Sequence, residues 1–267
     1  MGADIKKLRT RIKSVNSTLH LTKAMGLVAS SKIRKANDAM NRARAYAEAV
    51  RSTIAQLTAS EECLKSPYMA KREGGKIKLI VVAGDRGLAG GYNANIFRLM
   101  KDFPDAEVIP VGKRACDRYP GDVRFAEDFS SADAKVLANT LCDEFAQGSY
   151  DRIGIVCTKY ISMMSQEAQV RWVLPLEKSE NIKKTSILFE PDEMSVLNAV
   201  IPEYVAGVIA ECVKESFASE VAARRVAMDS AGKNAQEMLD SLGLAYNRAR
   251  QGAITQEITE IVAGSGS

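Results

Sequence analysis

Apolar residues recur at alternating steps of three and four from Ile5 to Leu57. One column of this pattern contains Ile5, Ile12, Leu19, Gly26, Ile33, Met40, Ala47 and Ile54, and the other contains Leu8, Val15, Thr22, Ala29, Ala36, Ala43, Val50 and Leu57. A sustained repeat of this kind is typical of a coiled-coil helix, and a helix packed in a globular core is the alternative. No proline occurs before Pro67, so nothing local ends the helix. We therefore predict a coiled-coil helix within residues 1–66.

This helix needs a partner, because at about 1.5 Å per residue it is roughly 80 Å long, while a compact chain of 267 residues is only about 47 Å across. A second helical stretch without proline runs from about Tyr204 to Val262. Its apolar stripe contains Phe217, Val221, Met228, Ala231, Ala235, Met238, Leu242, Ala245 and Ala249. Arg224 interrupts this stripe. The chain must leave the first helix and return along it, so we expect residues 191–267 to pair with it in antiparallel fashion.

After Ala249 the apolar pattern of the second helix changes. Ile254, Ile258, Ile261 and Val262 form a new face, which is out of phase with the earlier stripe. Exposed isoleucines at a helix end predict an apolar socket in another protein. A frayed helix end with marginal burial is the alternative.

The residues between the two helices, 76–190, alternate between strand and helix patterns. We expect strands at Ile77–Ala83, Glu107–Val111 and Arg152–Thr158, with weaker candidates at Gln169–Leu174 and Ser186–Glu190. Helical patterns cover 93–101 and 132–147. This alternation predicts an inserted α/β domain that is Rossmann-like, with a mostly parallel sheet and helices on both faces.

A glycine-rich loop follows the first predicted strand and contains Asp85, Arg86, Gly87, Gly90 and Gly91. A strand, a glycine-rich turn and a helix can present backbone N–H groups to a phosphate. The glycine spacing is not the dinucleotide fingerprint, however, and the loop lacks the Gly-Lys-Ser/Thr ending of a P-loop. A structural turn or a contact loop is therefore the favoured interpretation, and nucleotide binding is the alternative.

Composition and charge narrow the possible functions. With 46% hydrophobic and 26% charged residues the chain should fold, and its five cysteines contain no Cys-x-x-Cys pair that would indicate a zinc ribbon. No signal peptide is visible, and no apolar run approaches the roughly 18 residues of a membrane span. His20 is the single histidine, so the sequence lacks the residues for a Ser-His-Asp triad beside it or for a metal site with several histidines. We expect the His20 side chain to lie on the solvated surface. We predict a non-catalytic chain without a cofactor.

Three sequence blocks together resemble one known family. They are Leu21-Thr22-Lys23-Ala24-Met25 with the basic stretch that follows, Asp85-Arg86-Gly87-Leu88-Ala89-Gly90-Gly91-Tyr92-Asn93, and Tyr246-Asn247-Arg248-Ala249-Arg250-Gln251-Gly252-Ala253-Ile254-Thr255-Gln256-Glu257-Ile258-Thr259-Glu260-Ile261. In composition and order these blocks are similar to the gamma subunit of the F-type (rotary) ATP synthase of bacteria. Ala89 stands where many members of that family have cysteine.

The resemblance implies a central rotor shaft. Its partners would be three alpha and three beta subunits of the catalytic head, the epsilon subunit, and the ring of membrane c-subunits on which the α/β foot sits. Proton flow would turn the ring and the shaft, and the asymmetric shaft would drive each beta subunit through its conformations, with ATP-driven pumping as the reverse. The chain would lie on the cytoplasmic face of the plasma membrane as a peripheral protein, with no membrane insertion and no nucleic acid partner.

The resemblance also implies roles for individual residues. Met25 would face an acidic lever loop of beta, beside the cations of Lys23, Lys32, Arg34 and Lys35. A second loop of beta would meet Arg224, Arg250, Gln251, Thr255 and Glu257, which would explain why Arg224 breaks the apolar stripe. The face formed by Ile254, Ile258 and Ile261 would sit in an apolar bearing, and the glycine-rich loop would belong to the foot.

Two other classes of function remain open at this point. Lys and Arg greatly outnumber Asp and Glu in residues 1–57, whereas the rest of the chain is net acidic. A basic helix could bind the phosphates of nucleic acid, although no aromatic residue precedes Tyr46 to stack on bases. A nucleotide-dependent enzyme that uses the glycine-rich loop is the other alternative.

Overall fold

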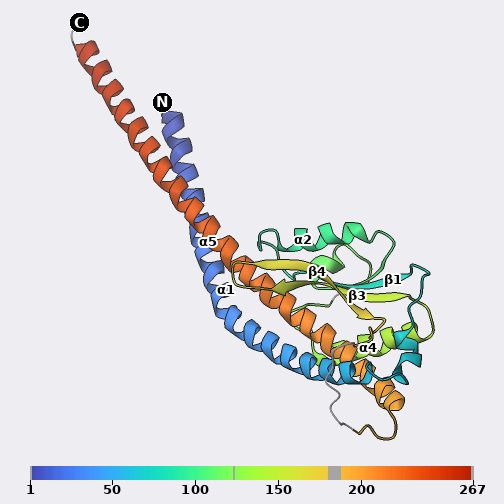
Figure 1. The fold of residues 1–267 in the computed structure, drawn as a ribbon. Helices are drawn as coiled ribbons and strands as arrows, with labels where there is room; N and C mark the ends of the chain where they lie inside the picture. The colour runs from blue at the N-terminus through green and yellow to red at the C-terminus, as the bar shows by residue number, and fades with distance from the viewer. Residues whose placement is uncertain (1, 123, 180–187, 266–267) are drawn as a thin grey trace. The chain divides into compact units, whose positions relative to one another are not determined.

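Two long helices dominate the fold, as the apolar patterns predict. The computed structural model describes residues 2–122, 124–179 and 188–265. Helix α1 spans Gly2–Leu57 and helix α5 spans Glu193–Ser265 (Figure 1). The chain divides into two compact units, which we call the helical unit (Met1–Ser30 and Arg224–Ser267) and the sheet unit (Ser31–Ala223). Each long helix contributes to both units, and the division into 1–66, 76–190 and 191–267 remains a prediction.

In the helical unit, α1 and α5 pair through the predicted seam. Leu19, Thr22, Gly26 and Ala29 are buried, and the earlier seam positions of α1 are half-buried. Gly26 lies against Met228 and Thr22 lies against Gly232, so rising numbers on α1 meet falling numbers on α5. This antiparallel pairing was predicted. The start of α1 and the end of α5 lie at the same end of the unit, and α5 continues past the start of α1 (Figure 1).

The predicted stripe of α5 is wrong at two positions. Met238 and Ala245 are exposed, while their neighbours Leu239 and Tyr246 are half-buried. In each of these two pairs of adjacent residues, both side chains are largely apolar. The sequence pattern therefore does not show which of the two lies on the seam. At Tyr246 the larger side chain takes the seam, because its burial removes more apolar surface from water.

The sheet unit contains a four-stranded sheet in the order β2-β1-β3-β4. Strands β1 (Ile77–Val82), β2 (Glu107–Val111) and β3 (Arg152–Tyr160) are parallel, and β4 (Gln166–Leu174) is antiparallel to β3. These strands confirm the expected mostly parallel sheet. The weak candidate at 186–190 begins outside the described residues, and its described residues 188–190 form no strand.

Helices cover both faces of this sheet, which explains the nearly continuous apolar run of β1. On one face Leu79 and Val81 pack with Ile96 of α2 (Tyr92–Leu99). On the other face Ile80 and Val82 pack with α4 (Ser131–Ala146) and with the sheet-unit segments of α1 and α5. A short helix α3 (Lys113–Cys116) and three single turns (Cys63–Lys65, Pro67–Met69 and Met100–Asp102) complete the described elements.

Helix α5 begins well before the predicted start near Tyr204. Asp192 caps it: its carboxylate accepts the backbone N–H of Ser195 at 2.8 Å and the Ser195 hydroxyl at 2.7 Å. Pro202 lies inside the helix, where its ring removes one backbone hydrogen bond. Leu197 and Ile201 are fully buried beside it, and this burial offsets the loss.

Within the described residues, α5 also contains a stretch that is long and apolar enough to cross a membrane, with a mean hydropathy of 1.6. We expected no such stretch from the sequence. It is 56% buried, and Leu197, Ile201, Val205 and Ile209 of this helix belong to the core of the sheet unit. The packing is that of a core helix.

We predict that only one of the five thiols reacts rapidly in the folded protein. Cys63, Cys142, Cys157 and Cys212 are buried, and Cys116 is half-buried. Burial raises the pKa of Cys142 to about 12, and contact with Cys212 together with burial raises the pKa of Cys157. Ellman's reagent at pH 8 should therefore label one thiol in buffer and all five in guanidinium chloride. Cys116→Ser should remove the rapid reaction; rapid labelling of two or more wild-type thiols would contradict this packing.

Candidate subunit-interaction surfaces

The helical unit exposes apolar side chains of α1 that lie outside the seam. Leu21, Leu27 and Val28 are exposed, with Leu27 at 70%, and Met25 beside them is half-buried. Lys23 is exposed within the same stretch. The sequence analysis singled out Met25 and Lys23 but missed the three neighbours, whose only signal was their position off the seven-residue repeat. An exposed apolar patch of this kind favours contact with another protein.

The last described turns of α5 expose the predicted apolar face. Ile254, Ile258 and Ile261 are all exposed, with Ile261 at 70%. Arg250, Gln251, Thr255 and Glu257 are exposed as well, and the Thr255 hydroxyl donates to the Gln251 carbonyl at 2.9 Å. The structure therefore brings these seven residues together at the end of one helix.

Arg224 differs from these residues, because it is only 9% exposed. Its side chain is largely covered by the chain itself. Burial within the chain accounts for its place on the stripe, so a contact with another subunit is not needed to explain it. Such a contact remains a prediction for its exposed edge.

The basic residues of α1 within the sheet unit have different environments. Lys32 forms an ion pair with Glu127, whereas Arg34 and Lys35 are exposed. Burial would raise the pKa of the Glu127 carboxyl, but Lys32, Arg86 and Lys35 outweigh burial and hold that pKa below its usual value. Lys32 is thus partly neutralised inside the chain, and Arg34 and Lys35 are the cations open to a partner.

In the glycine-rich loop, Asp85 organises the surrounding backbone. Its buried carboxylate accepts backbone N–H groups from Lys113 at 3.2 Å, Ala126 at 2.9 Å and Glu127 at 2.9 Å. Asp85 thereby ties the end of β1 to α3 and to the segment before α4. These bonds give Asp85 a structural role.

Glu220 of α5 holds the same loop from the other side. Its carboxylate accepts the backbone N–H groups of Asp85 and Arg86, each at 3.2 Å. The N–H of Gly84 donates to the Asn93 side chain at 2.8 Å. Three N–H groups that a phosphate would need are therefore already engaged within the chain.

The other glycines of the loop shape its path. Gly90 has a φ of +58°, a conformation that suits glycine, and Gly91 is the N-cap of α2. Gly87 is half-buried. The side chain of Arg86 is exposed and reaches Glu127 at 3.6 Å. The exposed part of this loop is consistent with a contact surface.

Two further acids of α5 were missed by the sequence analysis. Glu211 is buried and pairs with Arg51 of α1 at 2.9 Å and Arg171 of β4 at 2.6 Å. Glu215 is buried and pairs with Arg44 of α1 at 2.9 Å. Glutamates one turn apart in an apolar helix were the only sequence signal, and they do not reveal their partners.

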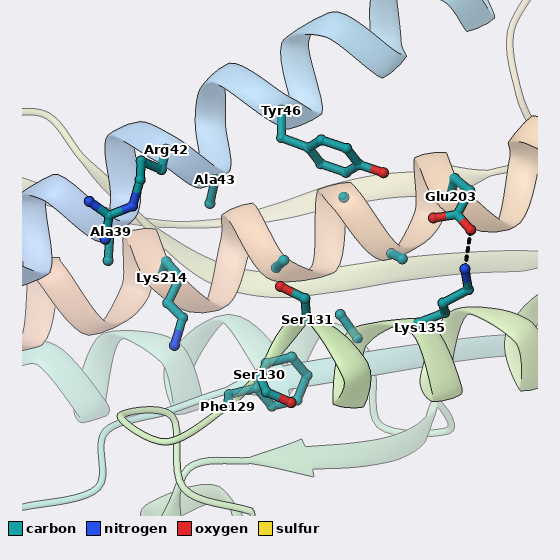
Figure 2. A pocket seen from close by; sticks show the side chains of 14 residues that line it. Ala39, Arg42, Ala43, Tyr46, Phe129, Ser130, Ser131, Lys135, Glu203 and Lys214 are labelled. Carbon is teal, nitrogen blue, oxygen red and sulfur yellow. Dashed lines mark hydrogen bonds and ion pairs between the residues drawn. The ribbon is translucent and has the colours of Figure 1, made fainter.

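A groove of about 480 Å³ lies in the sheet unit between α1, α4 and α5. Small residues such as Ala39, Ala43 and Gly207 line it, and the Lys135–Glu203 ion pair crosses one side (Figure 2). Burial lowers the pKa of Lys214, which points toward Ser130. The residues lining this groove form no nucleophile–base pair.

His20 is exposed, as predicted from its place on a basic helix. The exposed side chains of the helical unit are therefore candidates for contact with partners.

Comparison with known proteins gives full-length matches. The sequence model of a family described as ATP synthase matches residues 4–267. The ATP synthase gamma chain of Ruminococcus albus is 40% identical over 98% of each chain, and the sodium ion specific gamma chain of Acetobacterium woodii is 36% identical over 99% of each chain. A chain in the structure of the Euglena gracilis mitochondrial ATP synthase, with its F1 part and c-ring, has 19% identity and a TM-score of 0.69, covering 98% of this chain and 94% of that one.

We predict that Asp85→Ala destabilises the protein by about 1.5–3 kcal/mol, because three backbone N–H groups lose a charged acceptor. Urea denaturation of the full chain, followed by circular dichroism, measures this change in the free energy of unfolding. Arg86→Ala is the matched control, since its exposed side chain should contribute less than about 1 kcal/mol. Equal effects of the two substitutions would contradict the structural role of Asp85.

Proposed function

Because this chain belongs to the family of ATP synthase gamma chains, we propose that its paired terminal helices turn as the central shaft of an F-type (rotary) ATP synthase. The chain is a non-catalytic subunit of that complex. The identity of 40% over 98% of both chains carries this conclusion. We therefore favour the shaft function over a nucleic-acid-binding coiled coil and over a nucleotide-dependent enzyme.

The partners follow from the same assignment. They are three alpha and three beta subunits of the head, the epsilon subunit and the ring of c-subunits. Rotation of the ring turns this chain, and the chain drives the catalytic sites of beta in sequence. One of the relatives is sodium ion specific, so the flow of ions, either protons or sodium ions, would drive the rotation of this chain.

The exposed apolar side chains of the helical unit support a position in which the catalytic head surrounds this unit. Leu21, Leu27 and Val28 would expose apolar surface to water in an isolated helix pair. We place this patch, with Met25 and the cation of Lys23, against the acidic lever loop of beta. Opposite charges in such a contact attract, but an exposed pair contributes only about 0–1 kcal/mol, so no single orientation traps the shaft.

We place the end of α5 at the top of the head. Ile254, Ile258 and Ile261 would lie in an apolar bearing. The polar residues of the same turns would contact a second loop of beta; these residues are Arg250, Gln251, Thr255 and Glu257. The small exposed part of the Arg224 side chain would contact this loop as well.

The chain is a peripheral part of a membrane-associated complex. We propose that it lies on the cytoplasmic face of a bacterial plasma membrane. The full-length bacterial relatives support this location.

Co-expression with the alpha, beta and epsilon chains of the same organism tests the shaft function. We expect native mass spectrometry to find one copy of this chain with three alpha and three beta subunits, and ATP hydrolysis only in the assembly. The same subunits without this chain are the control. Isolation of this chain alone, or bound to duplex DNA, would refute the proposal.

Truncation after Ala253 tests the bearing. It removes the three exposed isoleucines, each of which would contribute about 1.5–3 kcal/mol if buried in the head. We expect the truncated chain to dissociate from the head roughly tenfold faster or more. A chain that ends after Ala263 keeps the isoleucines and is the matched control. Equal dissociation rates for the two truncations would exclude the bearing.

A further inference from the structure

The sheet unit has a crevice of the kind that binds ligands in other open parallel sheets. The chain passes from β1 to β2 on one side and then to β3 on the other, so the strand order reverses between β1 and β3. In doubly wound folds a ligand binds outside the carboxyl ends of the strands at this point. In this chain, the glycine-rich loop after β1 and the last residues of β3 border the corresponding crevice.

Side chains of α5 occupy this position. Strand β3 pairs with β1 only as far as Val156, and it continues to Tyr160. Beyond Val156, Ser216 of α5 accepts the N–H of Thr158 at 3.0 Å, and Ser219 donates to the Thr158 carbonyl at 3.4 Å. The helix thus supplies the hydrogen bonds that a neighbouring strand would otherwise make.

Glu215 extends this row of bonds. Its carboxylate accepts the N–H of Tyr160 at 3.2 Å while it pairs with Arg44 of α1. One acid therefore joins both long helices to the end of β3. Tyr92, at the start of α2, donates its hydroxyl to the Ser216 carbonyl at 3.0 Å, so a fourth element is attached to the same turn of α5.

The Glu220 carboxylate lies where such folds place a phosphate. Backbone N–H groups of a glycine-rich turn after the first strand bind the phosphate in those folds. Glu220 is 1% exposed and accepts two N–H groups of this turn. A Cβ atom on Gly84 would lie 2.9 Å from its carboxyl carbon, so glycine permits the close approach.

We propose that the hydrogen bonds made by residues 215–220 of α5 transmit torque from the sheet unit to this helix. We call this set of bonds the grip. The proposal rests on the shaft function. The gripping side chains form two adjacent pairs, Glu215 with Ser216 and Ser219 with Glu220, and the second pair follows the first by about one turn, on the same side of the helix. Apolar contacts have no preferred direction, whereas hydrogen bonds weaken steeply when their angle changes. The grip therefore resists a turn of α5 within the sheet unit, and α5 continues from this unit into the helical unit without a break.

Glu220→Gln tests the grip, because glutamine keeps the size of the side chain but loses the charge. Glu203→Gln is the matched control: it is a glutamate of the same helix in an exposed ion pair with Lys135. Tyr92→Phe is a second test variant, which removes one hydroxyl and leaves the ring in place. All three are compared in the full chain and in the assembled membrane complex.

The first measurement is hydrogen exchange of the Asp85 and Arg86 amides in the full chain. Loss of a charged acceptor should make this exchange roughly tenfold faster or more in Glu220→Gln, with no change in Glu203→Gln. The second measurement is ATP-driven ion pumping into vesicles, followed with a potential-sensitive dye, beside ATP hydrolysis by the detergent-solubilised complex. We expect both test variants to pump less against an opposing membrane potential at unchanged hydrolysis without load.

The outcomes separate the grip from a merely structural role. Faster amide exchange with normal pumping under load would overturn the proposal, because the bonds would then carry no torque. Unchanged amide exchange in Glu220→Gln would overturn it as well, since Glu220 would not hold the loop. A wild-type chain that does not support pumping at all would refute the shaft function itself and not the grip.

Discussion

The fold depends on the burial of α5 against several partners at once. In the sheet unit Leu197, Ile201, Val205 and Ile209 share one core with the sheet, α4 and the end of α1. Each large side chain buried there stabilises the fold by roughly 1.5–3 kcal/mol. In the helical unit the same helix is buried only along its seam with α1, through smaller residues such as Ala235. The apolar stripe of α5 therefore positions α1, α4 and one face of the sheet.

Polar bonds then fix the exact position of α5 within that core. Glu211, Glu215 and Glu220 are each buried, and a buried carboxylate without partners would be strongly unfavourable. Glu211 and Glu215 pair with arginines of α1, and Glu220 accepts N–H groups of the glycine-rich loop, so a shift of α5 by one turn would break all three sets of contacts. Such buried pairs contribute more to a unique arrangement than to net stability. For a subunit that must transmit a turning force, a unique arrangement is the useful property.

The same helix explains why the glycine-rich loop of this Rossmann-like sheet is not arranged to hold a phosphate. The backbone donors that a phosphate would need are directed at Glu220 and Asn93 of the chain itself. We propose that the functional surfaces lie elsewhere, on the exposed apolar side chains of α1 and on the end of α5. The fold alone would suggest an enzyme, whereas the site contacts indicate a mechanical part.

The sequence by itself determined the elements whose signal is local. The seven-residue repeat of α1 has every seam position buried or half-buried, and strands β1, β2 and β3 follow equally short patterns. It also predicted that the isoleucines at the end of α5 lie off the seam, because their phase differs from that of the seam, and they are exposed. Only the tertiary structure decided that α5 begins before Pro202, that Leu239 replaces Met238 on the seam, and that Glu220 meets the glycine-rich loop. These features depend on contacts between residues far apart in the chain, and no periodic pattern records which distant partner a buried side chain will find.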